Sequence, residues 1–484
     1  MKPEENVLYY GDNLDILRRH IKNESVDLIY LDPPFKSNQD YNVLFAEQNG
    51  TRSKAQIKVF EDTWRWDIGS EEAYREVVEL GGRVSQAMQA FRTFLGENDT
   101  MAYLSMMAPR LIELRRVLRE TGSIYLHCDP TASHYLKMLM DSIFDPKNFV
   151  NEIVWHYRKW PSGKYTFQRN HDIILFYSKS DSRNRIFNQQ YMERAPSTLK
   201  RFGKSKIVSG YDEDGLRIPS QMADEESEGV RQDDVWDIGR VPPIKQLFPT
   251  QKPEPLLRKI IDASTKRGQM ILDPFCGCGT TIVTAQEMKR NWIGIDITYL
   301  AITLIKHRLA DFGNKPIYNV VGEPVTLSEA QELAKEDPYQ FQWWALGLVN
   351  ARPIEEKRGA DKGIDGRIFF YDDTTGTTKQ IIISVKSGHV TSSQIRDLRG
   401  VVQREKAQIG VFITLEESSP QMKKEAATAG FYESKAWAKE YPVIQIVTIK
   451  ELLADKRIEY PPSKQVDRTF KKSSRQESKG QPEL

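Results

Sequence analysis

The sequence predicts an α/β protein whose main sheet is parallel and carries a ligand site at one edge. Two observations lead to this prediction. The apolar run 27–31 ends in Asp32 and two prolines, and the apolar run 270–272 ends in Asp273 and a glycine-rich turn. A short continuous apolar run that ends in a polar loop is typical of a strand buried on both faces. Open α/β sheets bind ligands beyond the carboxyl ends of such strands, so we expect the two loops to face each other.

The first loop has the chemistry to accept hydrogen bonds from a planar amine. Ionised Asp32 can only accept hydrogen bonds, and Pro33 and Pro34 make the loop stiff and remove two backbone donors. Phe35 adds a flat apolar face. We therefore expect a nucleobase with an exocyclic NH2 group to bind here. Taken alone, the motif fits a proline-rich turn with a capping Asp and a core Phe equally well.

The second loop is typical of a nucleotide site. Gly277 and Gly279 allow the backbone to approach a ligand closely where a helix begins, near Thr281. The apolar run 292–295 then ends in Asp296, near the spacing at which an acid holds ribose hydroxyls. Together these features favour an adenosine-bearing cofactor over a structural βαβ unit without a ligand.

Taken together, the two loops resemble those of amino-group DNA methyltransferases of the β arrangement. In that family the catalytic loop precedes the loop for S-adenosyl-L-methionine. The other segments that match in the same order are Gly11–Leu14, Asn151–Trp155, His171–Tyr177, Asp234–Asp237 and Pro249–Pro253. The resemblance covers about residues 7–312. It implies a Rossmann-like methyltransferase sheet with a circularly permuted motif order, within a domain of residues 1–322.

The resemblance also implies the roles of single residues. The catalytic loop comprises Asp32, Pro33, Pro34 and Phe35. The residues expected to bind S-adenosyl-L-methionine are Asp12, Asp273, Phe275, Gly277, Gly279, Thr280 and Asp296. The expected reaction is direct methyl transfer to N6 of an adenine flipped out of double-stranded DNA. Phe35 would stack on the base, while the Asp32 carboxylate and the Pro33 carbonyl accept hydrogen bonds from the amine.

Three alternatives stay open. Cytosine N4 is also an exocyclic amine, and adenine is preferred because family members that act on cytosine more often carry Ser at the position of Asp32. A catalytically silent DNA-recognition protein that carries a nuclease domain is the second alternative. RNA methylation is the third, and it is disfavoured by the endonuclease-like segment described below.

Composition indicates a water-soluble protein of two or three domains. The chain has 484 residues, of which 39% are hydrophobic and 28% charged. It contains no run of 18 apolar residues and no signal-peptide pattern at the N-terminus, so no membrane contact is expected. Only three cysteines are present, which argues against a disulfide framework and for the cytoplasm. Cys276 and Cys278 are expected to be small loop residues rather than zinc ligands, because a zinc site requires more ligands.

Charge is distributed unevenly along the chain. The net charge is only +2, but residues 158–206 contain twelve basic and three acidic residues with aromatic side chains between them. Lys and Arg side chains that neutralise phosphates supply most nonspecific affinity for DNA. Within a methyltransferase-like chain this segment favours DNA contact over a merely solvated face. The resemblance places the target-recognition region at about residues 180–246.

A second unit is expected at about residues 339–460, after a linker at 323–338 and before a disordered tail at 461–484. It resembles the Mrr-like branch of restriction endonuclease folds, so a smaller α/β domain is expected. Asp365 matches the family's Mg2+-binding acid and Lys386 its lysine. Ser384 stands where the family has Glu or Gln, and a hydroxyl is a weaker ligand.

Mg2+-dependent cleavage is therefore open, and it is expected only if Glu355 or Glu356 compensates for Ser384. The combination of the two units implies a restriction-modification or phage-defence role. Because many relatives of the β arrangement form dimers, a homodimer is a candidate assembly.

Overall fold

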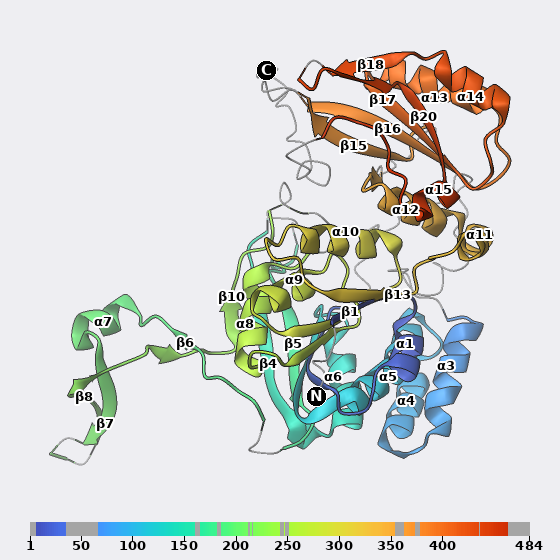
Figure 1. Ribbon diagram of the computed structural model, residues 1–484. Helices are drawn as coiled ribbons and strands as arrows, with labels where there is room; N and C mark the ends of the chain where they lie inside the picture. The colour runs from blue at the N-terminus through green and yellow to red at the C-terminus, as the bar shows by residue number, and fades with distance from the viewer. Residues whose placement is uncertain are drawn as a thin grey trace.

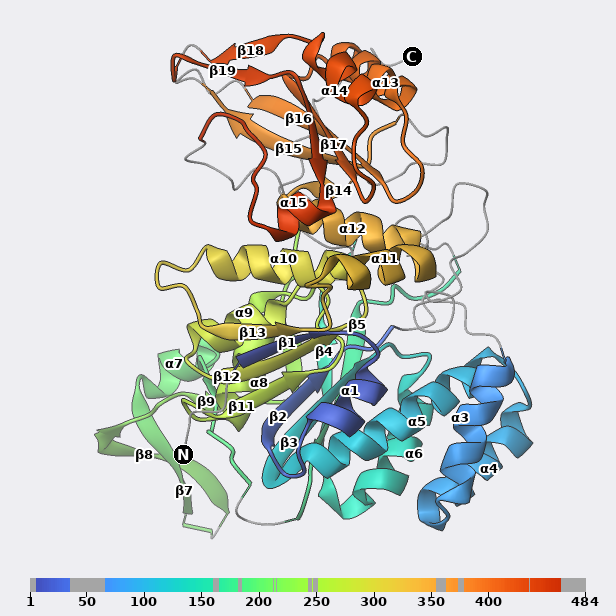
Figure 2. The same ribbon diagram turned by 45° about the vertical axis from the view of Figure 1, so that its right-hand side comes forward.

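The structure, a computed structural model, describes residues 6–34, 66–159, 165–181, 185–211, 213–214, 216–242, 246, 251–353, 363–372, 378–434 and 436–462. It consists of a large α/β unit and a smaller one stacked above it (Figure 1). The same two units are separate in the rotated view (Figure 2). The predicted fold class, a large parallel-sheet unit followed by a smaller α/β unit, is confirmed.

Among the described residues, nine strands form the large sheet. Their spatial order is β10 (Val235–Asp237), β4 (Phe149–His156), β5 (His171–Ser178), β3 (Leu118–Cys128), β2 (Val26–Leu31), β11 (Met270–Asp273), β12 (Asn291–Asp296), β1 (Asn6–Tyr10) and β13 (Tyr318–Val321). The strands from β3 to β13 pair in parallel, and β5 runs antiparallel to both β3 and β4. The carboxyl ends of the parallel strands and the start of β5 therefore meet at one edge.

Helices cover both faces of this sheet. One face is covered by α1 (Asn13–His20), α3 (Ile68–Glu79), α4 (Gly82–Leu95), α5 (Asp99–Val117) and α6 (Ser133–Phe144), and the other by α8 (Glu254–Ser264), α9 (Thr280–Glu287) and α10 (Tyr299–Ala310). A 3-10 turn, η2 (Pro146–Asn148), precedes β4.

Strand β2 is buried on both faces of the large sheet. All six of its residues are buried. Ile29 and Leu31 pack against the first helical layer, whereas Leu28 and Tyr30 pack against the second. A central parallel strand has no solvent face, so its side chains are apolar except for Tyr30 and Asp27, which are hydrogen-bonded. Asp27 accepts from Arg119, Gln269 and the Met270 N–H.

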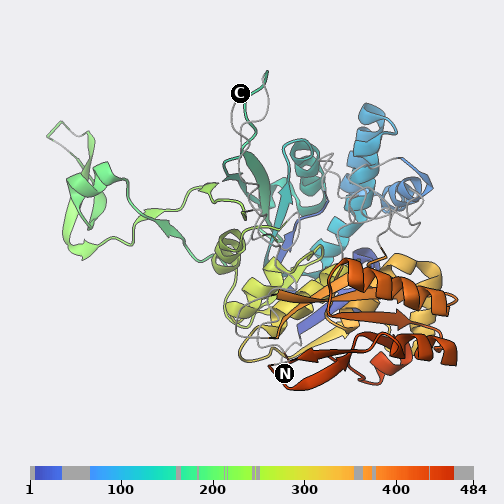
Figure 3. The same cartoon turned by 90° about the horizontal axis from the view of Figure 1, so that it is seen from above.

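A narrow arm leaves the large unit after β5 and returns before β10. It comprises β6 (Tyr191–Met192), α7 (Pro196–Phe202), β7 (Ser205–Tyr211), β8 (Arg217–Glu226) and β9 (Val230–Arg231). The view from above shows that it projects away from both sheets (Figure 3). The arm lies within the segment predicted to hold the target-recognition region, and that role stays a prediction.

The smaller unit has a five-stranded sheet among its described residues. Its strands, in spatial order, are β14 (Arg352–Pro353), β15 (Gly366–Tyr371), β16 (Thr378–Lys386), β17 (Ile409–Thr414) and β20 (Ile444–Thr448). A two-stranded sheet of β18 (Phe431–Ser434) and β19 (Lys439–Pro442) lies beside it. Helices α13 (Ser392–Arg404) and α14 (Pro420–Ala427) pack on one face.

Three helices connect the units: α11 (Leu327–Glu336), α12 (Pro338–Leu348) and α15 (Ile449–Leu453). One apolar core runs from α10 through α12 into the small sheet, with Leu304, Trp344 and Ile381 among its buried members. The predicted linker at 323–338 thus contains the helix α11. None of the described helices combines the length and the apolar character that a bilayer crossing requires.

Candidate active site at the edge of the large sheet

The two loops predicted to face each other lie side by side. Strands β2 and β11 are neighbours, with Leu28 paired to Ile271 and Ile29 to Leu272. Asp32 follows the end of β2 directly, and Asp273 ends β11. The next strands in the sheet, β12 and β1, bring Asp296 and the turn that contains Asp12 to the same edge. Four predicted site carboxylates therefore line one edge of the sheet.

The glycine-rich turn after β11 depends on its two glycines for different reasons. Gly277 has φ +49° and no atom within 4 Å of an added Cβ, so only its left-handed backbone demands glycine. Gly279 has φ +74°, and an added Cβ would lie 2.4 Å from Ile305 Cγ1. The close approach expected at Gly279 is therefore to helix α10. Thr280 then begins α9.

Asp296 holds this turn against β12. Its carboxylate accepts hydrogen bonds from the Gly277 backbone N–H at 2.8 Å, the Thr298 N–H at 2.9 Å and the Thr298 hydroxyl at 2.8 Å. Burial raises the pKa of Asp296, although these three donors oppose the shift. The backbone N–H of Ile297 is a fourth donor, so the local turn uses about all of the acceptor positions that two carboxylate oxygens offer.

The turn after β1 is tied to the glycine loop by a buried arginine. Arg110 Nη2 lies 2.7 Å from Asp12 Oδ2, and Arg110 Nε donates to Asn13 Oδ1 at 2.6 Å. Asn13 in turn donates to the Pro274 carbonyl at 2.8 Å. The turn and the loop form a small pocket, lined by Gly11, Asp12, Asn13, Pro274, Phe275, Asp296 and Ile297. Three residues predicted to bind the cofactor, Asp12, Phe275 and Asp296, thus share one pocket.

Asp273 is the most deeply buried of the predicted carboxyls. It is 3% exposed and accepts a hydrogen bond from the Phe275 N–H at 3.1 Å. Burial raises its pKa to about 7, and the negative charges of Asp32 and Asp296 add to the shift against the hydrogen bonds from Thr281 and Phe275. Near neutral pH, Asp273 is therefore protonated in a large share of molecules.

Asp32 presents one oxygen that the described residues leave unused. Lys252 Nζ donates to Oδ2, whereas Oδ1 is buried and accepts no hydrogen bond from any described residue. The imidazole of His127 lies close to Oδ1, with Nδ1 3.4 Å away. Pro33 and Pro34 follow in an irregular segment, and Phe35 lies outside the described residues. The stacking role predicted for Phe35 is therefore not placed.

Behind Asp32 lies a buried group that sequence reasoning missed. His127 is 0% exposed, and its Nδ1 is 3.1 Å from the Tyr30 hydroxyl. Its Nε2 is 3.2 Å from Asp172 Oδ2, and the Tyr157 hydroxyl donates to Asp172 Oδ1 at 2.9 Å. Burial alone would raise the pKa of Asp172, but the hydrogen bonds and charge of His127, together with Tyr157, bring it to about 2.

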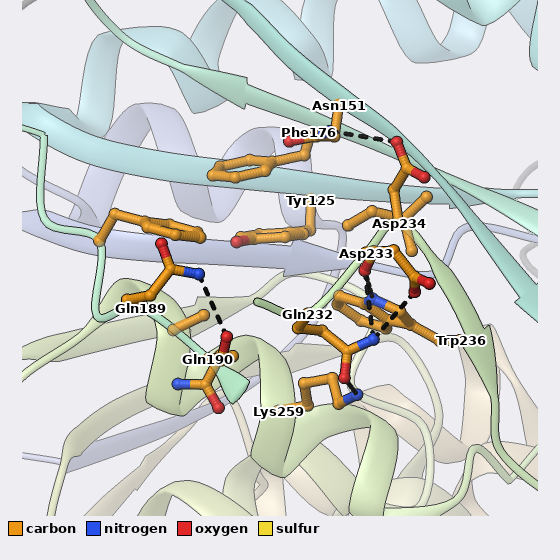
Figure 4. A pocket seen from close by; sticks show the side chains of 13 residues that line it. Tyr125, Asn151, Phe176, Gln189, Gln190, Gln232, Asp233, Asp234, Trp236 and Lys259 are labelled. Carbon is orange, nitrogen blue, oxygen red and sulfur yellow. Dashed lines mark hydrogen bonds between the residues drawn. The ribbon is translucent and has the colours of Figure 1, made fainter. Parts of the chain in front are cut away.

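A separate pocket lies at the base of the arm (Figure 4). Tyr125 and Phe176 stack in it with ring centroids 4.2 Å apart, and Trp236 lies across from them. Lys259 donates to Gln232 Oε1 at 2.7 Å, and Asn151 donates to Asp234 at 3.3 Å. None of the predicted site residues lines this pocket. Its polar contacts instead fasten the returning end of the arm to α8 and β4.

The small sheet brings Asp365 and Lys386 together without forming a metal site. Lys386 Nζ is 3.8 Å from Asp365 Oδ2. That oxygen accepts the Val385 N–H at 2.6 Å, and Oδ1 accepts the Gln342 amide at 3.1 Å. Ser384 is buried in β16.

Glu355 and Glu356, the residues expected to compensate for Ser384, lie outside the described part of the chain. Among the residues that the structure describes, no three potential metal ligands form a group. The donor set of these residues therefore does not fit Mg2+.

Comparison with known families agrees with both halves of this description. Residues 26–307, more than half of the chain, match the DNA methylase family of N6 and N4 methyltransferases, and the chain belongs to that family. Residues 340–454 match a family described as NACHT-associated inactive Restriction Endonuclease 1. The second unit is therefore similar to a restriction-endonuclease family that is described as inactive. This supports the Mrr-like resemblance only loosely, and nothing supports cleavage.

Individual relatives are distant. The Mod subunit of the type III restriction-modification enzyme StyLTI from Salmonella typhimurium is 25% identical over 58% of this chain and 49% of its own length, so the chain spans about half of that relative. The DNA adenine methyltransferase YhdJ of Escherichia coli is 25% identical over 63% of this chain and 83% of its own. The solved PvuII DNA methyltransferase, which is cytosine-N4-specific, is 14% identical over 64% and 88% of the two chains, with a TM-score of 0.38.

Proposed function

We propose that this chain transfers a methyl group from S-adenosyl-L-methionine to the N6 amine of an adenine in double-stranded DNA. The observation that carries the proposal is Asp32 Oδ1, a buried acceptor that no described residue uses, next to the glycine-rich turn of β11. Membership of the DNA methylase family supports the reaction class. The adenine-specific relative supports adenine as the acceptor.

The residues at the sheet edge would have two tasks, to bind the cofactor and to position the acceptor amine. S-adenosyl-L-methionine, when bound, supplies a methyl group on a positively charged sulfur. The pocket between Asp12, Phe275 and Asp296 would hold its adenosine part, with Asp296 near the ribose. The four cofactor residues outside or beneath this pocket, Asp273, Gly277, Gly279 and Thr280, would shape the turn.

Asp32 and Pro33 would act on the acceptor amine. Because Lys252 occupies Oδ2, the free Oδ1 of Asp32 is the atom left for an amine N–H. The Pro33 carbonyl would accept the second N–H and turn the nitrogen lone pair toward the methyl group. Such positioning corresponds to effective molarities of about 10^5 M or more. The base must first leave the duplex, because a stacked amine cannot reach this edge.

The arm and the basic segment 158–206, which overlaps the first part of the arm, would contact DNA. Lys200 and Arg201 lie on α7 of the arm, and residues 158–206 as a whole are strongly basic. Side chains of the arm would supply the contacts to base edges that select a target sequence. A role in restriction-modification or defence, and a homodimer as the acting form, belong to the same proposal.

Nucleoside mass spectrometry tests this function directly. The full chain is incubated with S-adenosyl-L-methionine and unmethylated genomic DNA of mixed sequence, and the DNA is digested to nucleosides. We expect N6-methyladenosine in its deoxy form. Detection of N4-methylcytosine instead would change the acceptor to the N4 amine of cytosine and leave the reaction class, methyl transfer to DNA, unchanged. The absence of any methylated nucleoside would contradict the proposal and favour a silent DNA-recognition protein.

A further inference from the structure

The groups behind Asp32 have no role in the proposed transfer as described so far. They are the buried His127, Tyr30 and Tyr157 and the half-buried Asp172. His127 lies at the end of β3, with Tyr30 of β2 on one side and Asp172 of β5 on the other. Its side chain is 0% exposed, between carboxylates on both sides. A buried histidine that contacts two acids does more than fill space, because each polar contact must offset the cost of burial.

The contacts assign the tautomer of His127. An ionised carboxylate can only accept hydrogen bonds, so the proton of neutral His127 belongs on Nε2, which faces Asp172 at 3.2 Å. Nδ1 then carries a lone pair and lies 3.1 Å from the Tyr30 hydroxyl and 3.4 Å from Asp32 Oδ1. The hydroxyl can donate to neutral Nδ1 and can turn to accept from it once Nδ1 is protonated. Tyr157 holds the other oxygen of Asp172. The arrangement therefore consists of the Asp172 carboxylate, the His127 ring that it orients, and Nδ1 of that ring as the nitrogen that can accept a proton.

We propose that His127 and Asp172 form a proton relay that takes up the proton which the methylated amine gives to Asp32. The proposal rests on the proposed function. The amine nitrogen forms a bond to the methyl carbon while the carbon–sulfur bond breaks and its electron pair stays on sulfur. The nitrogen, now positively charged, loses one proton to Asp32 Oδ1. The Tyr30 hydroxyl turns from donor to acceptor as that proton passes to Nδ1 of His127, and ionised Asp172 balances the imidazolium charge. After the methylated base leaves, the proton returns to solvent through Asp32, whose side chain is 16% exposed.

The basicity of imidazole and the charge of Asp172 favour proton transfer from Asp32 to His127. Imidazole is a stronger base than a carboxylate, with reference pKa values of about 6.5 and 3.9. Asp172 stays ionised near neutral pH, since its pKa is about 2.

The groups that face the relay come from several elements. Tyr30 and Asp32 belong to β2 and the loop after it, Tyr157 follows β4, Asp172 starts β5, and Lys252 precedes α8. On β3 itself the neighbours are Cys128, whose thiol pKa burial raises well above its ordinary value, and Asp129 at the strand end. Among these side-chain types, imidazole is the one whose charge generally changes between pH 5 and 8.

Two substitutions test the relay. His127→Gln keeps an N–H for Asp172 but removes the proton-accepting nitrogen, and Asp172→Asn removes the charge that orients the ring. Single-turnover methyl transfer is measured from about pH 5.5 to 9, with His134→Gln on the exposed face of α6 as control. We expect the wild-type rate to rise through the imidazole range. Both variants should be at least about 100-fold slower, and His127→Gln should lose the pH dependence.

Binding separates this result from simple misfolding. The affinities of both variants for S-adenosyl-L-methionine and for DNA should stay within threefold of the wild type. Rates within threefold of the wild type at every pH, with binding intact, would overturn the relay and leave the methyltransferase function standing. A wild-type chain that methylates no DNA would instead overturn the proposed function.

A measurement without turnover decides the matter if a variant fails to fold. Nitrogen-15 NMR of histidine-labelled wild-type protein reports which ring nitrogen of His127 carries the proton, assigned by comparison with the control variants. We expect the Nε2–H tautomer near neutral pH. An Nδ1–H tautomer would overturn the relay, because that nitrogen could not receive a proton from Asp32.

Discussion

Two sheet edges in this molecule carry an aspartate with a lysine beside it, and they differ in what the aspartate has left to offer. At the large sheet, Asp32 binds Lys252 through Oδ2 and keeps a buried Oδ1 that no described residue uses. At the small sheet, both oxygens of Asp365 are taken, one by the Val385 N–H and one by the Gln342 amide. The pair of residue types is the same, but only the first carboxylate keeps a buried oxygen that no described residue hydrogen-bonds.

The same comparison extends to the surroundings. The Asp32 edge gathers further acids from β11, β12 and the turn after β1, along with a buried histidine. The Asp365 edge has Ser384 where a second acid would be needed, and Lys386 stands 3.8 Å away. A functional site thus requires several converging groups, and a two-residue match does not establish one.

Replacement of Asp32 should have the largest effect. Asp32→Ala removes the acceptor for the amine, so the rate of methyl transfer should fall by about 1,000-fold or more. The affinity for S-adenosyl-L-methionine, measured by calorimetry, should change less than threefold. A comparable loss of cofactor affinity would mean that Asp32 has a different task.

Replacement of Asp296 should act on the cofactor instead. Asp296→Ala leaves the Gly277 N–H, the Thr298 N–H and the Thr298 hydroxyl without their acceptor. The loss of one to two such bonds corresponds to about 1–3 kcal/mol, or a tenfold to hundredfold weaker affinity. Asp311→Ala at the exposed end of α10 is the control. An unchanged dissociation constant in Asp296→Ala would separate this residue from the cofactor site.

The buried arginine that joins the two turns should matter for stability. Arg110→Met leaves Asp12 and Asn13 without their main donor. Because the Asp12 side chain is 29% exposed and water can replace part of the contact, we expect a loss of about 1–3 kcal/mol in the free energy of unfolding in urea. Arg115→Met, exposed on the same helix, should cost less than about 0.5 kcal/mol. Equal losses in the free energy of unfolding for the two variants would contradict the role of Arg110 in joining the two turns.

The small unit should lose stability in acid through Asp372. Burial would raise the pKa of this carboxyl, but Ser434, Tyr432 and Lys379 outweigh it and hold the pKa below its usual range. A carboxyl with a lowered pKa in the folded state stabilises the fold above its ordinary pKa, and that stability is lost as the pH falls. Thermal unfolding should show this loss between about pH 5 and 3.

Asp372→Asn provides the matching change. It should cost about 1–3 kcal/mol at pH 7, because an amide is a poorer acceptor for three donors. Its unfolding temperature should then depend less on pH than that of the wild type in the same acid range. An identical acid dependence in both proteins would assign the effect to other carboxyls.

The smallest effects on methyl transfer are expected at the edge of the small sheet, where Asp365 and Lys386 lie. Asp365→Ala and Lys386→Ala should change the rate of methyl transfer by less than twofold. In Mg2+, the wild type and both variants should leave supercoiled DNA intact over hours, as judged by gel electrophoresis. Cleavage by the wild type that Lys386→Ala abolishes would show that the smaller unit is active after all.

The sequence predicted the parts of the site that follow directly from buried strands. Asp32, Asp273 and Asp296 each end an apolar run, so their common edge follows from parallel pairing alone. His127 also ends such a run, on β3, but its partners Tyr30 and Asp172 come from β2 and an antiparallel strand. Only the inserted antiparallel β5 brings Asp172 to that edge, and local sequence does not encode that insertion.

Other differences have similarly physical causes. The segment predicted as a linker, residues 323–338, contains a helix, because Thr326 and Glu329 form a capping box that starts α11 there. Gly279 was expected to admit a ligand, whereas its close neighbour is Ile305, which a later helix supplies. At the small sheet the sequence placed Asp365 near Lys386 correctly, but the Gln342 bond that occupies Asp365 depends on how α12 packs.

A crystal structure with bound S-adenosyl-L-methionine would test the central claim most directly. We expect the adenosine part in the pocket lined by Asp12, Phe275 and Asp296, with the methyl group directed toward Asp32 Oδ1 at a distance that admits one amine nitrogen between them. A ligand bound at the base of the arm, or a methyl group turned away from Asp32, would contradict it.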